Sequence, residues 1–342
     1  MKYTFISLFL AIQIGCQNNP HGDVENHPVR NAHSMVYHSQ DSLVYVFGGA
    51  DERQVLGDLL VLKDRSWRKV IANTSPQPRT FASMCYDTKH DRVILFGGSK
   101  VLFGIEPDQE NLLNDTWQYK DSEWQQISIN SRPKARAEMA MAYDENRNVT
   151  VLFGGYTIEK GEYVKLGDTW ELHDNEWHLM SKTGPTQRNG ASMVYHPKDE
   201  TVLLFGGSTV DRQYGNGKGE TWQWDGKEWY RLQIEQPSGV YNTSMSYDMK
   251  LESIVRFGGW NGTSRIDETW MFDGITWKQV QMEDRPAPRN HSEMIYDEKR
   301  KEVVLFGGHD GQRVFSDLWL LKDGKWTELI SSEPTERIDN GH

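Results

Sequence analysis

The sequence predicts an all-β protein, a six-bladed β-propeller with four antiparallel strands in each blade. The tripeptide Phe-Gly-Gly occurs six times, at intervals of 49, 57, 52, 52 and 49 residues. A period near fifty residues is typical of propeller blades. An apolar run rich in β-branched residues precedes each copy, as expected for a strand. The copies begin at Phe47, Phe96, Phe153, Phe205, Phe257 and Phe306.

Each repeat contains signals for four successive strands. The first strand ends in Met-x-Tyr, and this spacing places both side chains on one face. A polar turn leads to the second strand, which closes in Gly-Gly. The third strand opens with an acidic residue, usually followed two positions later by Trp, and another Trp marks the fourth strand. The acids are Asp58, Asp115, Asp168, Glu220, Glu268 and Asp317, and the fourth-strand tryptophans are Trp67, Trp124, Trp177, Trp229, Trp277 and Trp326.

The tryptophans indicate how the blades pack. Eleven of the 13 occupy fixed places in the repeat, and only Trp224 and Trp260 do not. A residue that recurs in every blade is expected to serve packing between blades, where each buried indole contributes roughly 2 to 3 kcal/mol. Cys85 lies in a predicted first strand and is interpreted as a packing residue.

The apolar run, the Gly-Gly pair and the spaced Tyr and Trp together resemble the kelch repeat, a four-stranded propeller blade. The repeat motifs are similar to those of exported bacterial kelch proteins of unknown role, a group related to galactose-oxidase-like propellers. The resemblance covers residues 29–329, with blades at about 29–72, 73–129, 130–181, 182–234, 235–282 and 283–329. Blade 1 starts with its innermost strand and blade 6 ends with its outermost, so no strand is expected to be exchanged between the termini. Residues 330–342 form a C-terminal tail, read as a closing segment rather than the start of a seventh blade.

The N-terminus has the features of an export signal. Lys2 precedes an apolar run from Phe5 to Ile14, which is too short to span a bilayer. The ending Ile14-Gly15-Cys16 resembles a bacterial lipoprotein signal, although Gln13 departs from that pattern. We expect a signal peptide at 1–15, acylation of Cys16 and a tether over 16–28, with ordinary secretion as the alternative. The protein is then exported, either as a cell-envelope lipoprotein or secreted.

Charge and motifs exclude several functions. The formal net charge of −11 argues against nucleic acid or an anionic membrane as the main partner. The chain has no phosphate-binding Gly-Lys loop, nucleophile elbow or His-x-x-x-His motif, and its Gly-Gly pairs open no helix. No cofactor and no metal are expected, and a galactose-oxidase-like copper site is not supported. The expected state is a monomer whose membrane contact is limited to the lipid anchor.

An arginine precedes the first strand in five of the six repeats, and blade 5 has Val240 followed by Tyr241 there. These positions and the connections between second and third strands lie on one face of a propeller. Two interpretations remain open: the arginines pair with the acids that open the third strands, or they bind a ligand carboxylate or sulfate. The arginines are Arg30, Arg79, Arg136, Arg188 and Arg289.

The same face is predicted to carry long loops over 99–113, 156–166 and 208–219, where recognition residues are often placed. Tyr156, Trp260 and His309 follow Gly-Gly directly and are candidate ligand contacts, as is Tyr241. Packing within the loops is the alternative.

Four first-strand residues are polar where sister repeats have small or apolar ones: His33, Glu138, His291 and Glu293. Either glutamate is a candidate acid or base if burial raises its pKa, and a hydrogen-bonded structural carboxylate is the alternative.

Two functions follow. The first is a non-catalytic module of the cell envelope that binds a protein or glycan through the arginine face. The second is a sugar-acid mutarotase, resembling periplasmic sialic acid epimerases, in which arginines hold a carboxylate while Glu138 or Glu293 moves protons.

Overall fold

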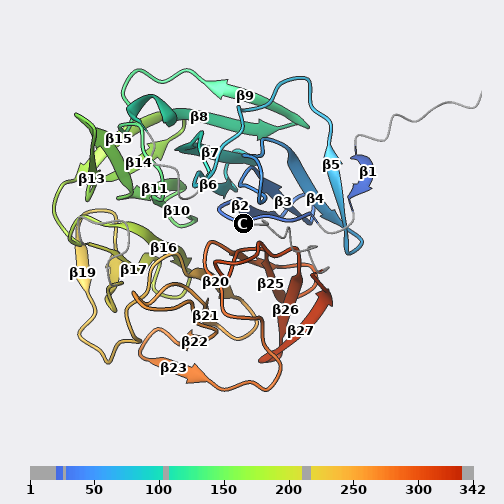
Figure 1. The fold of residues 1–342 in the computed structure, drawn as a ribbon. Helices are drawn as coiled ribbons and strands as arrows, with labels where there is room; N and C mark the ends of the chain where they lie inside the picture. Colours follow the sequence, from blue (N-terminus) through green and yellow to red (C-terminus); the bar gives the residue numbers. More distant parts are fainter. Residues whose placement is uncertain (1–20, 26–27, 103–107, 210–216, 333–342) are drawn as a thin grey trace, which may run out of the picture.

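The computed structural model describes residues 21–25, 28–102, 108–209 and 217–332. Six antiparallel sheets with four blade strands each stand around a central axis, and the sheet of blade 1 has a fifth strand, which confirms the predicted propeller (Figure 1). The strands of blades 1 to 3 are β2 (Ser34–His38), β3 (Leu43–Phe47), β4 (Leu59–Lys63) and β5 (Ser66–Val70); β6 (Ser83–Asp87), β7 (Arg92–Ser99), β8 (Leu112–Lys120) and β9 (Glu123–Ile127); and β10 (Ala140–Asp144), β11 (Val149–Phe153), β14 (Thr169–His173) and β15 (Glu176–Ser181). Those of blades 4 to 6 are β16 (Asn189–His196), β17 (Thr201–Ser208), β18 (Thr221–Trp224) and β19 (Trp229–Arg231); β20 (Ser244–Asp248), β21 (Ser253–Phe257), β22 (Thr269–Phe272) and β23 (Trp277–Val280); and β24 (Glu293–Asp297), β25 (Glu302–Phe306), β26 (Leu318–Lys322) and β27 (Lys325–Ile330).

The ring closes between blades 6 and 1 without strand exchange. The Arg30 amide donates to the Phe315 carbonyl (3.2 Å), and the Gly308 amide donates to the Arg30 carbonyl (2.8 Å). Residues 21–25, predicted to be part of a tether, instead form β1 (His21–Glu25), which pairs with β5 as a fifth, outermost strand. An outer strand offers free backbone groups that any extended segment can pair with, so side-chain periodicity gave no signal for β1.

The predicted signal peptide, Cys16 and residues 333–342 lie outside the described residues. Among the residues that are described, none belongs to a helix long and apolar enough to cross a membrane.

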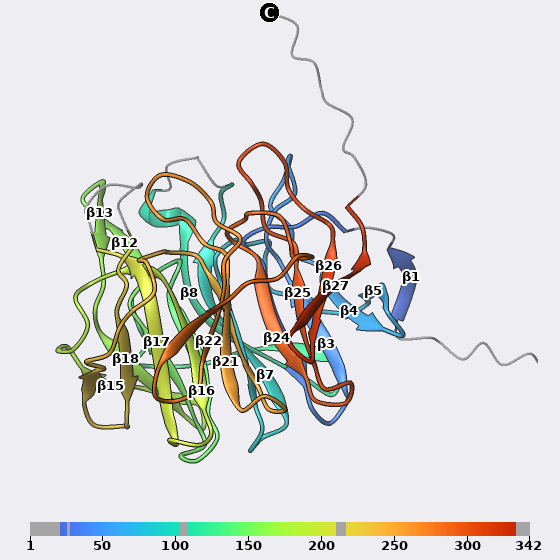
Figure 2. The ribbon, with the colours of Figure 1, turned by 90° about the horizontal axis from the view of Figure 1, so that it is seen from below.

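One face of the ring, here called the top face, carries the connections between second and third strands. Blade 3 projects a hairpin from this face, made of β12 (Tyr156–Glu159) and β13 (Glu162–Lys165) (Figure 2). In blade 2 a short 3-10 helix, η1 (Gln109–Asn111), precedes β8. Strands β7 and β17 continue past Gly-Gly to Ser99 and Ser208, so the irregular part of those loops is shorter than the sequence suggested.

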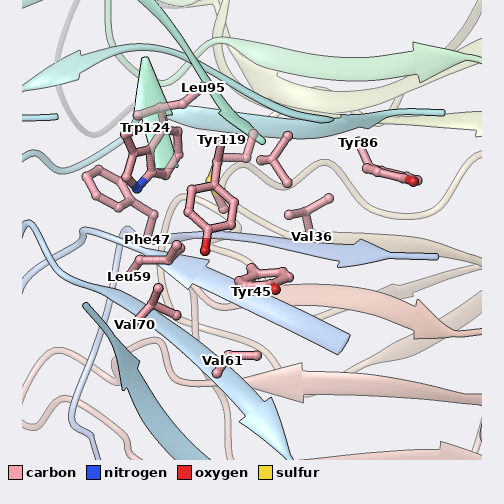
Figure 3. Packing of buried hydrophobic residues seen from close by; sticks show 12 residues of the cluster. Val36, Tyr45, Phe47, Leu59, Val61, Val70, Tyr86, Leu95, Tyr119 and Trp124 are labelled. Carbon is pink, nitrogen blue, oxygen red and sulfur yellow. The ribbon is translucent and has the colours of Figure 1, made fainter. Parts of the chain in front are cut away.

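The core consists of clusters between neighbouring blades. In the cluster between blades 1 and 2, Met84 and Tyr86 from one strand face pack with Tyr45 and Phe47, as the Met-x-Tyr spacing predicted. Trp124 lies 5.2 Å from Phe47 between ring centroids and is 2% exposed (Figure 3). The tryptophan predictions are confirmed in the sense that each fourth-strand indole is buried between two sheets.

Most fourth-strand indoles donate a hydrogen bond to the preceding blade. The acceptor is the threonine that follows the third-strand acid, at 2.8 to 3.0 Å, as in the bond from Trp177 to Thr116. Blades 1 and 6 have Leu59 and Leu318 in place of that threonine. Within the described chain, the indole nitrogens of Trp124 and Trp67 accordingly have no partner.

A closed ring of backbone hydrogen bonds surrounds the top of the central channel. In each blade the residue three positions before the first-strand methionine has a left-handed φ of 52° to 64°. Its amide donates a hydrogen bond to the carbonyl of the equivalent residue in the preceding blade, at 2.7 to 3.2 Å. Five of the six are not glycine, and a left-handed backbone is unfavourable for such residues. The hydrogen bonds over-determine this conformation and fix the channel mouth. The ring residues are Ala32, Phe81, Glu138, Gly190, Asn242 and His291.

Candidate functional site

The five arginines before the first strands, here called the rim arginines, are ion-paired. Arg79 donates to both carboxylate oxygens of Asp115 at 2.6 and 2.8 Å and to the Gly97 carbonyl at 3.0 Å, with no exposed surface. All five are at most 2% exposed, and each pairs with the acid that opens the third strand of its own blade. Of the two interpretations left open by the sequence, the structure has the ion-paired one. A guanidinium so committed offers no free fork to a ligand.

The pairs also act on the acids. Burial alone would raise the pKa of Asp115, but the hydrogen bonds and charge of Arg79 outweigh burial and hold it below its usual value. The Trp117 indole donates to the same carboxylate at 2.7 Å. The third-strand tryptophan thus has a role that the sequence did not reveal: its indole N–H donates a further hydrogen bond to the acid two residues before it.

Blade 5 replaces its missing rim arginine from another strand. Arg256 lies in β21, where sister strands have leucine or valine, and it has no exposed surface. Its guanidinium reaches Glu268 at 3.3 Å and the Gly258 carbonyl at 3.4 Å, the same two groups that a rim arginine contacts in the other blades. Val240, at the rim position itself, is fully buried. A charged residue inside an apolar strand run was the available signal in the sequence.

The four candidate aromatic and histidine contacts are mostly buried. Tyr156 and Tyr241 are each 6% exposed and His309 is 7% exposed. Tyr156 packs with Tyr163 of hairpin β12–β13, at 4.8 Å between ring centroids. Trp260 is half-buried beneath the Arg265 guanidinium, 5.0 Å from its ring. These residues mostly pack beneath the top face and contribute little of its exposed surface.

A chain of hydrogen bonds crosses the channel mouth. The His309 and His291 rings are joined at 2.9 Å, and His291 is joined to the Asn242 amide at 2.6 Å. Arg265 lies 3.5 Å from the other nitrogen of His309. Burial first, and then the Arg265 charge, lowers the pKa of His309 to about 4. Burial, followed by the charges of His309 and Arg265, places the pKa of His291 well below its usual value, so both imidazoles are neutral at pH 7.

Two small cavities occupy the central channel. The upper chamber, about 80 Å³, is lined by residues of all six blades, including the ring residue Glu138. The lower chamber, about 100 Å³, is lined by Met139 and by five of the six inner-strand methionines. Glu293 lines both chambers. A larger groove of about 620 Å³ lies away from the axis, beside the 51–57 connection of blade 1.

The two candidate glutamates differ in their surroundings. Glu138 accepts a hydrogen bond from Asn189. Burial raises the pKa of Glu138, while Asn189 and the charge of Lys165 oppose that rise. Glu293 forms no hydrogen bond or ion pair with the described residues, and burial alone raises its pKa to about 8. Neither glutamate forms an ion pair with a rim arginine.

His33 is the second unsatisfied side chain of the channel. It lines the upper chamber, is 2% exposed, and neither of its ring nitrogens has a partner in the described part of the chain. Burial, with the Arg30 charge second, lowers its pKa to about 3. Its ring is therefore neutral and retains one acceptor nitrogen.

No group of three or more His, Cys, Asp or Glu suited to a metal ion occurs within residues 21–25, 28–102, 108–209 and 217–332. Cys85 is buried with its sulfur 3.2 Å from the Thr150 hydroxyl of blade 3, which agrees with a packing role.

Comparisons with known proteins identify the class to which this fold belongs. Residues 10–173 and 145–342 match the KLHDC2/KLHL20/DRC7 Kelch-repeats domain, and the chain belongs to this kelch-repeat family. It is 26% identical over 209 residues to Mei4-dependent protein 6 of Schizosaccharomyces pombe, covering 54% of this chain and 29% of that protein. It is 30% identical over 202 residues to the F-box/kelch-repeat protein At1g51550 of Arabidopsis thaliana, covering 52% of this chain and 39% of that one.

A third relative is the human multiple epidermal growth factor-like domains protein 8, 27% identical over 189 residues, which are 52% of this chain and 6% of that protein. The chain thus spans well under half the length of these curated relatives. Among solved structures, the one described as "Structure of YjhT" superposes with a TM-score of 0.67 over 89% of this chain and 98% of that chain. Its sequence identity is 14%, so this likeness concerns the fold alone.

Proposed function

We propose that the protein is a non-catalytic binding module that recognises a protein partner, or a glycan, through its top face. The observation that carries the proposal is that the connections on this face are of two kinds. Blade 3 carries the hairpin β12–β13, whereas blades 5, 6 and 1 end in short turns of one design. Connections of differing length on a rigid scaffold are where proteins commonly place recognition residues.

The connections of blades 1, 5 and 6 are three matching turns. In blade 1 the Asp51 carboxylate accepts the amides of Arg53 and Gln54 at 2.6 and 2.7 Å. Asn261 and Asp310 do the same in blades 5 and 6. The turns hold exposed charged and polar side chains at fixed positions, among them Glu52, Arg53 and Arg313.

The test compares two variants by affinity capture and on a glycan array. The top-face variant carries Glu52→Ala, Arg53→Ala and Arg313→Ala. The control carries Glu298→Ala and Lys299→Ala, exposed residues of the β24–β25 turn on the opposite face. We expect the top-face variant to lose partners that the wild type and the control retain. Equal binding by all three proteins contradicts the proposal.

The proposed location is the cell envelope, through acylation of Cys16 after removal of residues 1–15. The support is the sequence alone: an apolar run followed by Gly15-Cys16. Metabolic labelling with an alkyne fatty acid is expected to mark the wild type and not Cys16→Ala. Equal labelling of the two proteins, or none, contradicts lipidation and leaves secretion.

A sugar-acid mutarotase remains the second candidate, supported by one observation: Glu293 lines the channel with its pKa raised to about 8. The ion-paired rim arginines weigh against it, because they were the groups expected to hold the substrate carboxylate. NMR exchange spectroscopy of N-acetylneuraminate anomers with wild type and Glu293→Gln distinguishes the two functions. Faster anomer exchange that depends on Glu293 supports the enzyme.

A further inference from the structure

The channel residue Glu293 breaks an otherwise regular pattern. The equivalent residue is serine in four sister blades, Ser34, Ser83, Ser192 and Ser244, and alanine in blade 3. Each serine hydroxyl donates to a carbonyl of the next blade, at 2.7 Å for Ser34 and 2.8 Å for Ser83. Glu293 makes no such bond, and its longer side chain lines the channel space instead. It is not needed to join blade 6 to blade 1.

The walls around Glu293 offer acceptors and few donors. The ring amides at the channel mouth are all donated to ring carbonyls, and the serine hydroxyl protons are committed to carbonyls below them. The hydroxyl oxygens keep free lone pairs. The ring amides are committed to carbonyls and are not available to an anion. A cation with several N–H groups would meet the Glu293 carboxylate and these hydroxyl oxygens.

The chamber volume limits the size of that cation. A space of about 80 Å³ corresponds to the liquid volume of roughly three water molecules. It accommodates ammonium, methylammonium or the tip of a lysine side chain. The described residues contain no three-ligand group for a metal ion, which also favours an organic cation.

We propose that the upper chamber is a binding site for a primary ammonium group, with Glu293 as the counter-ion and the hydroxyl oxygens of Ser83, Ser192 and Ser292 as hydrogen-bond acceptors. Glu138 approaches from blade 3, which faces blade 6 across the ring, and its charge is offset by Lys165. The ammonium belongs either to a small amine or to a lysine or N-terminus of a partner. The site does not depend on the proposed top-face function.

Binding is expected to release a proton, because the ammonium pairs with the ionised carboxylate. The other ionisable side chains that line the upper chamber are His33, Glu138 and His291, and Glu293 is the only one lining the lower chamber. Arg30, Lys165 and Arg265 act on that set from outside the chambers. Both histidines stay neutral near pH 7, whereas burial raises the pKa of Glu138 as well as that of Glu293. Loss of proton release in Glu293→Gln therefore identifies Glu293 as the source of the proton.

Isothermal titration calorimetry of the full chain with methylammonium chloride tests the proposal, in two buffers of different ionisation enthalpy at pH 7. Saturable binding with release of nearly one proton is expected. Glu293→Gln and Glu293→Ser should weaken binding about 10- to 100-fold, as expected for loss of a charge-assisted hydrogen bond. Glu293→Ser restores the sister-blade residue, so folding should be retained. Glu283→Gln, an exposed acid outside the chambers, is the matched control and should bind like the wild type.

Tetramethylammonium, which lacks N–H groups, and sodium are the control ligands. Equal binding of either one, or wild-type affinity in Glu293→Ser, overturns the proposal, as does the absence of saturable methylammonium binding. A lysine-containing peptide and its acetyl-lysine form separate the two sources. Tighter binding of the unmodified peptide than of methylammonium identifies a partner's side chain, and binding of methylammonium alone identifies a small amine. Neither result depends on the top-face variant described above.

Discussion

The rim and the channel of this propeller treat charged residues in opposite ways. At the rim an arginine recurs in five blades, and each is buried against a carboxylate of its own blade. In the channel Glu293 occurs in one blade, and it has no partner within the described residues. A charge that every repeat keeps is a structural part of the repeat. A charge that one repeat introduces without compensation is a better indication of a function.

Blade 5 supports this contrast, because it lacks the rim arginine and yet retains the ion pair between an arginine and the third-strand acid. Arg256 supplies the guanidinium that Val240 cannot, so the acid Glu268 is still paired. The channel has no corresponding repair for Glu293. The following predictions test this difference, from the largest expected effect to the smallest.

Removal of one rim acid should destabilise the whole ring. Asp115→Ala leaves the fully buried Arg79 without its carboxylate, and breaking such a pair typically costs about 3 to 5 kcal/mol. Urea unfolding followed by tryptophan fluorescence measures the loss of free energy. A loss below about 1 kcal/mol would place the rim pairs with ordinary surface ion pairs and remove the contrast with the channel.

Blade 5 permits a rescue experiment. Arg256→Leu should destabilise the protein by about 3 kcal/mol, since Glu268 loses its partner. Adding Val240→Arg restores the arginine at the position that the other five blades use, and most of the lost stability should return. The control is Val240→Arg alone, which places two guanidinium groups beside one acid and should destabilise. Additive effects of the two substitutions would show that Arg256 does not replace a rim arginine.

Glu293→Ser should stabilise the protein, in a direction opposite to the rim variants. The folded protein keeps the Glu293 proton up to a pKa of about 8, while the unfolded chain loses it near 4.5. The unfolding free energy contributed by this residue therefore falls as pH rises from about 5 to 8. We expect Glu293→Ser to add about 1 to 3 kcal/mol at pH 8 and little at pH 5, allowing for water in the channel. A pH-independent difference would contradict an unpaired Glu293 whose pKa is raised by desolvation.

The rim acids give the reverse pH dependence. Their pKa values are held below the ordinary range for Asp58, Asp115, Asp168 and Glu220. Their contribution to the free energy of unfolding is present above about pH 4 and is lost as the pH falls through the lowered pKa values. Denaturation curves recorded at pH 7, 4 and 3 should show this loss in Glu293→Ser as in the wild type.

The smallest effect is expected at the indole bonds. Leu59→Thr supplies the missing acceptor for Trp124 but removes two buried carbons, so the satisfied indole should offset part of that loss and the net change should be about 1 kcal/mol or less. Thr116→Val removes the acceptor of Trp177 and should destabilise by about 1 to 2 kcal/mol. Equal effects of the two changes would show that the Trp-Thr bonds contribute little beyond packing.

The sequence by itself determined the ring. Six copies of Phe-Gly-Gly, Met-x-Tyr and the spaced tryptophans specify six equivalent sheets, because each repeat can bury its faces only against its neighbours. The same repetition placed the arginines and the third-strand acids at one rim. It also marked Glu138, Glu293, His33 and His291 as exceptions.

Only the tertiary structure decided how those charges are used. A guanidinium has enough reach to pair with an acid of its own blade or to face a ligand, and spacing along the chain does not distinguish the two. The outcome depends on distances between strands that are 28 to 36 residues apart in sequence. The replacement of a rim arginine by Arg256 and the position of Glu293 in the channel depend likewise on contacts across strands and blades, which sequence periodicity does not encode.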